Sequence, residues 1–120
     1  MSVRAIRGAI QVEANSVEAI ASGVKELLPA ILLANGIVTD QVISVLLTAT
    51  PDLNADFPAA SAREVGFGSV PLLCATEIDV PGALPRVIRA MLHCEISVLP
   101  SEIKHIYLKG ATALRKDLAQ

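Results

Sequence analysis

The chain has 120 residues, of which 52% are hydrophobic, and its ten basic and twelve acidic side chains give a formal net charge of −2. This is the length of one domain, so we expect residues 1–120 to fold as a single unit. The apolar content and the low net charge exclude intrinsic disorder. A membrane helix needs roughly 18–20 apolar residues. The longest charge-free segment, Leu27–Thr39, is shorter and holds a proline and a glycine.

Charge and cysteine content narrow the class of partner. The basic residues form no stripe of the kind that binds nucleic acid, so we expect neither a nucleic-acid nor a membrane partner. The apolar share is high for a small domain with little interior, which indicates contact between subunits. Cys74 and Cys94 lie in apolar segments without CxxC spacing, and the N-terminus lacks the apolar core of a signal peptide. Both features favour a reduced, cytoplasmic protein.

A long helix is predicted from its end signals. Asn15, followed three residues later by Glu18, predicts a capping box, and apolar residues then keep the helical period from Val17 onward. Gly36 predicts the C-terminal end. Pro29 lies inside this helix and is expected to kink it or to break it locally.

Short apolar segments predict the strands. They are Val3–Val12, Val42–Thr50, Val70–Thr76, Val87–Ile96, whose first half also fits a helix, and His105–Leu108. A short helix is expected to begin near Pro58 and to stop at Gly66, and Ser101–Lys104 is expected to form one helical turn. Strands outnumber helices, so the fold class is α+β: a mixed β-sheet packed with one long helix and short helical turns.

Four polar residues lie within or at the end of predicted strands, namely Arg7, Glu77, Arg89 and Tyr107. A buried charge has to be paired or has to meet a ligand. An internal ion pair with a core tyrosine is the simplest explanation, but one glutamate can neutralise only one of the two arginines. The second arginine then needs an anion from elsewhere. The pattern therefore favours a pocket for a small anion, and by itself it indicates no reaction.

The sequence contains no motif that indicates metal, nucleotide or nucleophilic chemistry. His93 and His105 lack the spacing of metal ligands, and no GxGxxG, P-loop or HExxH motif occurs. We therefore expect no metal and no cofactor. No histidine stands in an interpretable arrangement with a serine, threonine or cysteine nucleophile, and the apolar surroundings of Cys74 are typical of a packed thiol.

Four collinear segments together resemble the monofunctional, trimeric chorismate mutases of the barrel-like class. They are VRAIRGAIQVE (3–13), TATPDLNADFPAASARE (48–64), VPLLCATEIDVPGALPRVIR (70–89) and HIYLKGATALRKDL (105–118). The resemblance covers nearly the whole chain. The all-helical class of chorismate mutase does not fit, because this chain has too many strand segments.

The resemblance implies a homotrimer whose sheets pack into a pseudo-α/β-barrel, with active sites in clefts between neighbouring subunits. The reaction would be the [3,3] Claisen-type rearrangement of chorismate to prephenate in phenylalanine and tyrosine biosynthesis, without cofactor, metal or covalent intermediate. Two alternatives are a trimeric enamine/imine deaminase-like enzyme, whose motifs are not seen, and a non-catalytic metabolite-binding trimer. Arg89 argues against the latter, because its cation serves the transition state more than substrate binding.

The resemblance also implies roles for single residues. Arg89 would supply the cation at the ether oxygen of chorismate, while Arg7 and the Tyr107 hydroxyl would bind carboxylate. Glu77, with the backbone and side chain of Cys74, would bind the ring hydroxyl. The catalytic residues implied are therefore Arg89, Glu77 and Arg7. The remaining substrate-binding residues implied are Phe57, Ala59, Arg63, Leu72, Leu73, Leu114 and Arg115. The C-terminal tail is expected to be mobile without ligand and partly ordered with it.

Three residues depart from the family pattern. Ala60 stands where a longer charged residue is common, Leu73 stands where a polar one is common, and Pro29 is unusual inside the long helix. None of them is one of the four polar strand residues, so we expect them to affect affinity more than chemistry.

Overall fold

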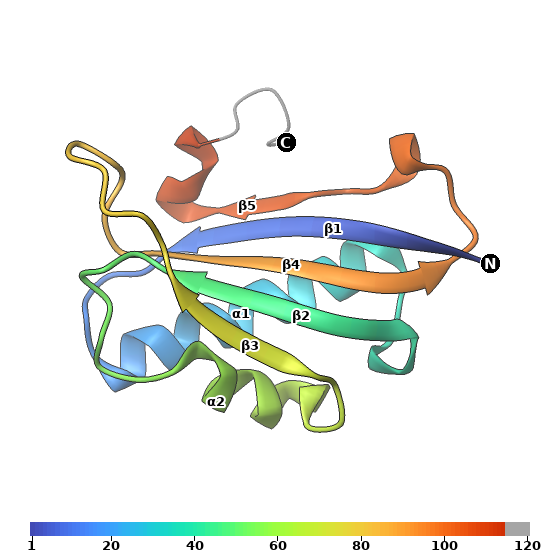
Figure 1. Ribbon diagram of the computed structural model, residues 1–120, viewed down its shortest axis with the longest axis horizontal. Coiled ribbons are helices and arrows are strands. Elements are labelled where there is room, and N and C mark those ends of the chain that lie inside the picture. Colours follow the sequence, from blue (N-terminus) through green and yellow to red (C-terminus); the bar gives the residue numbers. More distant parts are fainter. Residues whose placement is uncertain (115–120) are drawn as a thin grey trace.

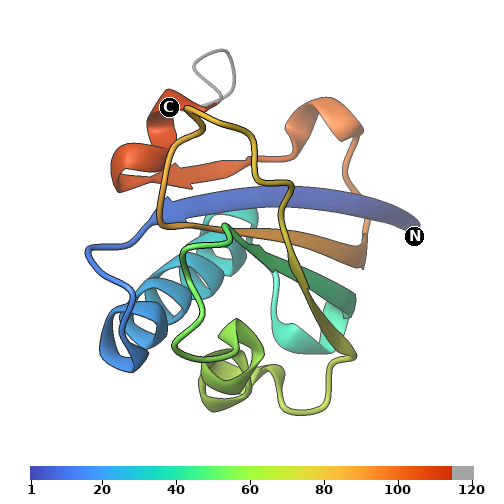
Figure 2. The ribbon, with the colours of Figure 1, turned by 60° about the vertical axis from the view of Figure 1, so that its left-hand side comes forward.

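The computed structural model describes residues 1–114 of the 120-residue chain, so Arg115 lies outside the described residues. Five strands form one mixed sheet in the order β3-β2-β4-β1-β5 (Figure 1). The strands are β1 (Ser2–Gln11), β2 (Val42–Ala49), β3 (Leu72–Thr76), β4 (Val87–Ile96) and β5 (Ile106–Leu108). The helices are α1 (Val17–Asn35) and α2 (Pro58–Ala62), and both lie on the same side of the sheet (Figure 1 and Figure 2). The predicted α+β class with a mixed sheet is confirmed.

The strand order follows from two kinds of pairing. The central strand β4 is antiparallel to both β1 and β2, whereas the edge strands β3 and β5 run parallel to β2 and β1. Parallel neighbours need a crossover connection, which α2 supplies between β2 and β3. Arg89 of β4 lies opposite Ala9 of β1 on one side and Thr48 of β2 on the other. These three side chains therefore share one face of the sheet.

The start of α1 corrects the predicted capping box. Ser16, not Asn15, is the N-cap: its backbone is extended, and its hydroxyl accepts a hydrogen bond of 3.1 Å from the Ala19 N–H. The side chain of Asn15 is engaged elsewhere, because its Oδ1 accepts hydrogen bonds from the backbone N–H groups of Asn54 and Ala55. The C-terminal end is as predicted, with Gly36 in left-handed backbone at φ 62.

Pro29 does not break α1, so that part of the prediction is wrong. The helix continues from Val17 to Asn35 with Pro29 inside it. Proline removes the N–H that would bond the carbonyl of Lys25, four residues earlier. Both residues are exposed, so water can hydrate that carbonyl and the helix continues past Pro29 without a break.

The segment after β2 confirms the predicted short helix. Pro58 is the first residue of α2, where a missing N–H is tolerated, and a π-type turn at Arg63–Phe67 carries the chain onward. Gly66 has φ 102 in this turn, which glycine adopts without strain. The 3-10 turns of the structure are Thr39–Gln41, Pro100–Glu102 and Lys109–Ala113.

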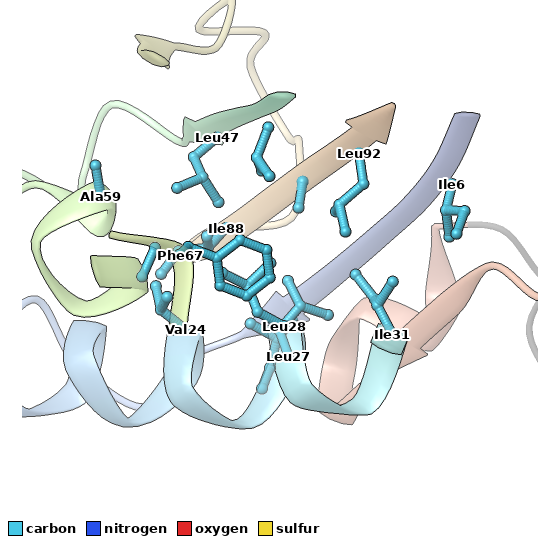
Figure 3. Close-up of a cluster of buried hydrophobic side chains, with 14 of the residues drawn as sticks. Ile6, Val24, Leu27, Leu28, Ile31, Leu47, Ala59, Phe67, Ile88 and Leu92 are labelled. Carbon is cyan, nitrogen blue, oxygen red and sulfur yellow. The ribbon is translucent and has the colours of Figure 1, made fainter. Parts of the chain in front are cut away.

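The core lies between the helices and the sheet, as Figure 3 shows for part of it. Ile88 and Leu92 of β4 point into it, and they meet Leu28 and Ile31 of α1, all fully buried. Burial of each such side chain stabilises the fold by about 1.5–3 kcal/mol. Gly8 of β1 permits the close approach of α1, because a Cβ there would lie 2.6 Å from Ile31 Cδ1.

The opposite face of the sheet, which we call the open face, has no α-helix of residues 1–114 packed over it (Figure 2). By strand alternation it carries Arg7 and Arg89. Its exposed apolar residues are Val3, Leu46 and Leu73. At one end the 3-10 turn after β5 packs on it and forms a second cluster of buried residues: Ala9, Val87, Tyr107 and Ala111. In the part of the chain described, no helix is long and apolar enough to cross a bilayer.

Candidate active site

An ion pair between Arg89 and Glu77 is the centre of the site. Arg89 projects from the middle of the sheet on β4, and Glu77 directly follows the edge strand β3. The Nε of Arg89 lies 3.0 Å from Oε2 of Glu77 and donates to its Oε1 at 3.2 Å. The side chain of Arg89 is 43% exposed and that of Glu77 is 17% exposed. The pair therefore has an accessible cation held by a mostly covered carboxylate.

Two further hydrogen bonds hold Glu77 in place. Its backbone N–H donates to the carbonyl of Ala49 at 2.9 Å, which fixes the chain as it leaves β3. The hydroxyl of Thr48 donates to Oε2 of Glu77 at 2.6 Å. Of the Arg89 nitrogens, only Nε is bonded within residues 1–114, so both Nη groups remain available to a ligand.

Arg7 is the second cation of the open face. Its backbone N–H donates to Nδ1 of His105 at 3.0 Å, while its guanidinium makes no ion pair with any residue between 1 and 114. Within residues 1–114 the one carboxylate of Glu77 thus neutralises Arg89 and leaves Arg7 without an ion-pair partner, as the sequence pattern suggested. A bidentate guanidinium without a carboxylate partner is suited to bind an anionic ligand.

A cleft of about 250 Å³ joins these two cations on the open face. Its lining residues are Arg7, Gly8, Leu46, Thr48, Arg89, Ala90, Met91 and Tyr107. Tyr107, on β5 opposite Ala9, is 7% exposed and borders the cleft at the edge of the sheet. The cleft therefore combines two guanidinium groups and a phenol with apolar walls, which suits a small organic anion with an apolar body.

A second hollow of about 280 Å³ lies on the other side of Arg89. Glu77, Arg89 and Leu114 line it, together with the acidic residues Asp52 and Asp79. Arg89 is the residue that both hollows share. The structure thus brings Arg7, Glu77, Arg89, Tyr107 and Leu114 of the predicted set to one region.

The other predicted residues lie elsewhere in the chain. Phe57, at 72% exposed, precedes α2, and Arg63 follows α2. Leu73 of β3 is 65% exposed on the open face. The edge strands β3 and β5 are four strand spacings apart, or roughly 19 Å at ~4.8 Å each. A small ligand therefore cannot touch Leu73 and Tyr107 of one chain together.

Three predicted lining residues point away from the open face. Ala59 is buried in the core, and Leu72 and Cys74 are half-buried against the same core on the helix-covered face. Their side chains line neither hollow beside Arg89. The alternation of β3 decides this, because Leu73 takes the open face and its two neighbours must take the other.

Cys94 is outside the site. It is fully buried on the helix-covered side of β4, and desolvation by burial raises the pKa of its thiol. Its Sγ contacts the carbonyl oxygen of Arg4 at 3.6 Å. No cluster of three or more His, Cys, Asp or Glu side chains able to hold a metal occurs within residues 1–114.

Thr48 is a site residue that reasoning from the sequence did not single out. It bonds Glu77 and lines the cleft. A signal was present, because Thr48 is a polar residue inside the apolar segment Val42–Thr50. Only the register, which places Thr48 directly opposite Arg89, shows that this polar position faces the site.

Comparisons with known proteins identify the family to which the chain belongs. Residues 3–118 match the family described as chorismate mutase type I. The chain is 46% identical over 117 residues to the chorismate mutase AroH of Thermus thermophilus, covering 97% of this chain and 96% of that protein. It is 42% identical over 120 residues to the chorismate mutase AroH of Bacillus subtilis, covering 99% and 94%.

A solved structure shows the same fold. The chorismate mutase from Clostridium thermocellum superposes with a TM-score of 0.89 at 43% sequence identity, covering 91% of this chain and 97% of that chain. Sequence and structure therefore agree over nearly the full length. The chain belongs to the type I chorismate mutase family and is an isomerase that converts chorismate to prephenate in aromatic amino-acid biosynthesis.

Proposed function

We propose that this chain rearranges chorismate as a homotrimer, in clefts formed where two copies meet, with Arg89 as the principal catalytic residue. The observation that carries the proposal is the open cleft lined by two arginines, of which Arg89 is paired with Glu77 and Arg7 has no ion-pair partner within residues 1–114. The match to chorismate mutases along nearly the full length does not favour a deaminase or a non-catalytic binding protein. We further propose a cytoplasmic location, which fits two free cysteines.

The separation of the predicted residues supports a shared site. Arg7, Arg89 and Tyr107 line one cleft, whereas Phe57, Arg63 and Leu73 lie on or near the edge strand β3 and α2. A neighbouring copy whose β3 edge approaches the open face would bring the second group to the first. The exposed apolar side chains on this face support such a contact, because a partner would bury them.

The chemistry requires positioning and charge stabilisation. Chorismate is a dianion with a ring hydroxyl and an enolpyruvyl ether. In one cyclic transition state its ether C–O bond breaks and a new C–C bond forms, while the electron pairs shift within the ring of six atoms. No proton and no electron is exchanged with the protein. A residue can help by holding the side chain over the ring and by donating to the ether oxygen as negative charge builds there.

Arg89 is suited to that second task. Glu77, itself bonded by Thr48, holds the Nε of Arg89 before substrate arrives, and the Nη groups of Arg89 have no hydrogen-bond partner among the described residues. A donor that is already oriented costs little reorganisation in the transition state. The loss of one such donor typically lowers the rate on the order of 10²–10³-fold.

The polarity of each of the other site residues indicates which part of the substrate it binds. Arg7 and the Tyr107 hydroxyl bind a substrate carboxylate in the cleft. Glu77 keeps acceptor capacity beside its bonds to Arg89 and Thr48, so it can also accept from the ring hydroxyl. Cys74 contributes through the backbone of β3, because its side chain packs against the core and an edge strand leaves outward backbone groups open.

Apolar and charged residues close the site around the ring. Phe57 before α2 and Leu73 on β3 are exposed apolar residues that would each supply part of an apolar wall, Arg63 after α2 would add a cation, and Leu114 borders Glu77 and Arg89. Ala59 and Leu72 would support these walls from the core side. Arg115, which lies outside the described residues, is proposed as a further substrate-binding residue.

The first test is the loss of chorismate absorbance with purified protein, run beside Arg89→Ala. We expect rapid loss with prephenate formed by the wild type, and a rate lower by about 10²-fold or more for the variant. An Arg89→Ala protein that keeps the wild-type rate would remove Arg89 from the mechanism.

The shared site has its own test. We would mix Arg89→Ala with Arg63→Ala under conditions that exchange subunits, with each variant alone as control. If each site takes Arg89 from one copy and Arg63 from its neighbour, roughly a quarter of the sites in a random one-to-one mixture regain both residues. Activity should rise to about that share of wild type. No recovery in exchanged trimers, or a monomer in sedimentation, would contradict the shared site.

A further inference from the structure

Two turns beside the site have unusual backbone. Among the residues described, Arg86 and Lys109 are the non-glycine residues with positive φ, each at 56°. Arg86 immediately precedes β4, which carries Arg89, and Lys109 immediately follows β5, which carries Tyr107. L-residues rarely adopt this conformation, and it persists only where the surroundings hold it. The packing around both turns should therefore contain the contacts that hold them.

The contacts of Arg86 account for the first turn. Its backbone N–H donates to Oδ2 of Asp52 at 3.0 Å, and its Nε donates to the carbonyl of Val12 at 3.0 Å. The N–H of Val12 returns a bond of 2.8 Å to the Arg86 carbonyl. The entry into β4 is thus tied to the end of β1.

Gln11, the last residue of β1, touches both turns. Its Nε2 donates to the carbonyl of Pro85 at 3.0 Å, just before Arg86. On its other side it packs against Gly110, just after Lys109. A Cβ on Gly110 would overlap Oε1 of Gln11 and lie 2.8 Å from its Cδ. Gly110 does not have positive φ, so this contact, and not its backbone, is what favours glycine there.

The two turns lead to Leu84 and Leu114, two residues that line the hollow beside Arg89. The first belongs to the loop that begins at Glu77 and includes Leu84, and the second leads to Leu114. Both leucines pack against the small cluster that contains Tyr107. In Figure 1 the loop after β3 and the turn after β5 lie together at the end of the sheet where β1 ends.

We infer that Gln11 is a positioning residue that links these two turns and so sets the distance between the Leu84 and Leu114 walls around bound substrate. It touches no substrate itself and acts through the Pro85 carbonyl and Gly110. The inference rests on the proposed site beside Arg89. Chorismate would be retained less well when the link is broken, because the wall at Leu114 would no longer be held against the loop.

The experiment is a double-mutant cycle with Gln11→Ala, Gly110→Ala and the double variant, plus Gln11→Met. We expect KM for chorismate to rise roughly three- to ten-fold in Gln11→Ala, with kcat changed less than about two-fold. Gln11→Met keeps the length of the side chain without the donor, so its KM should rise as well. Gly110→Ala should displace the Gln11 head from Pro85 and raise KM similarly. The double variant should then be no worse than either single one.

A matched control is Gly68→Ala. Gly68 has φ −62, and the nearest atom to an added Cβ there is 3.9 Å away, so its kinetics should match wild type. The inference is overturned if the two KM effects multiply, if Gln11→Met matches wild type, or if only kcat and the melting temperature fall at constant KM. The last result would indicate loss of folded enzyme. Arg89→Ala, measured alongside, separates these outcomes: wild-type activity in that variant would instead refute the proposed site.

Discussion

The two faces of the sheet use the same strands for different purposes. On β4, Ile88 and Leu92 are fully buried under α1, while Arg89, between them in sequence, is 43% exposed on the open face. The helix-covered face is closed within one chain and supplies the burial that stabilises the fold. The open face keeps two guanidinium groups accessible and exposes apolar side chains beside them. Stability and chemistry are therefore separated by the alternation of a single strand.

The largest effect should come from the open face. Arg89→Ala should lower kcat by about 10²–10³-fold, whereas its free energy of unfolding should change by about 1 kcal/mol or less, because the side chain of Arg89 is 43% exposed. Steady-state kinetics and urea unfolding measure the two quantities. Arg89→Lys is the matched variant: it keeps the charge but not the forked donor, so most of the loss should remain. A large loss of stability in Arg89→Ala would contradict the separation of the two faces.

The opposite result is expected from the covered face. Leu28→Ala on α1 removes a fully buried side chain and should lower the free energy of unfolding by about 2–5 kcal/mol. The rate per folded enzyme should stay near wild type, because Leu28 lines neither hollow beside Arg89. Chemical denaturation, with activity measured well below the transition, tests both statements. A specific loss of kcat in fully folded Leu28→Ala would show that the faces are coupled.

A smaller effect tests how Arg89 is held. Thr48→Val removes the hydroxyl that bonds Glu77 at 2.6 Å while keeping the side-chain shape. Glu77 would then hold Arg89 less firmly, and kcat should fall by roughly three- to ten-fold. Thr48→Ser keeps the hydroxyl and should restore most of the rate. Equal rates for the valine and serine variants would exclude this role of Thr48.

The smallest effect concerns pH and the buried thiol. Burial raises the pKa of Cys94 above its usual value, so the unfolded chain loses this proton first as pH rises. Stability from this group is full below the unfolded pKa of ~8.5 and declines above it. Cys94→Ala should remove that part of the pH dependence, and Cys74→Ala should keep it. In the native protein the half-buried Cys74 should react with a thiol reagent well before Cys94.

Local signals in the sequence were sufficient for most elements. The segment Val87–Ile96 was predicted with the bounds it has in β4, and Gly36 ends α1 as predicted. The prediction failed where it had to choose between two adjacent residues, because Ser16 and not Asn15 caps α1. Pro29 is tolerated because it lies on the exposed side of α1. The prediction from helical periodicity did not take into account which side of the helix Pro29 occupies.

The candidate site was predictable in part for the same reason. A charge within an apolar strand is a local observation, and it identified Arg7, Glu77 and Arg89 as residues that need partners. The residue with which each of these charges pairs depends on contacts between segments that are far apart in the chain. Glu77 reaches Arg89 because the chain leaves the edge strand β3 beside Ala49, and no sequence period contains that information.

Local patterns in the amino-acid sequence were enough to predict the strands, the long helix, and the residues that alternate between a core face and a charged face. These follow from covalent geometry, since side chains alternate along any strand. The three-dimensional packing was needed to show that Glu77 pairs with Arg89 and leaves Arg7 without an ion pair among residues 1–114. It also placed Tyr107 and Leu73 at opposite edges of the sheet. Those results depend on strand order and register, which are set by contacts between residues far apart in the chain.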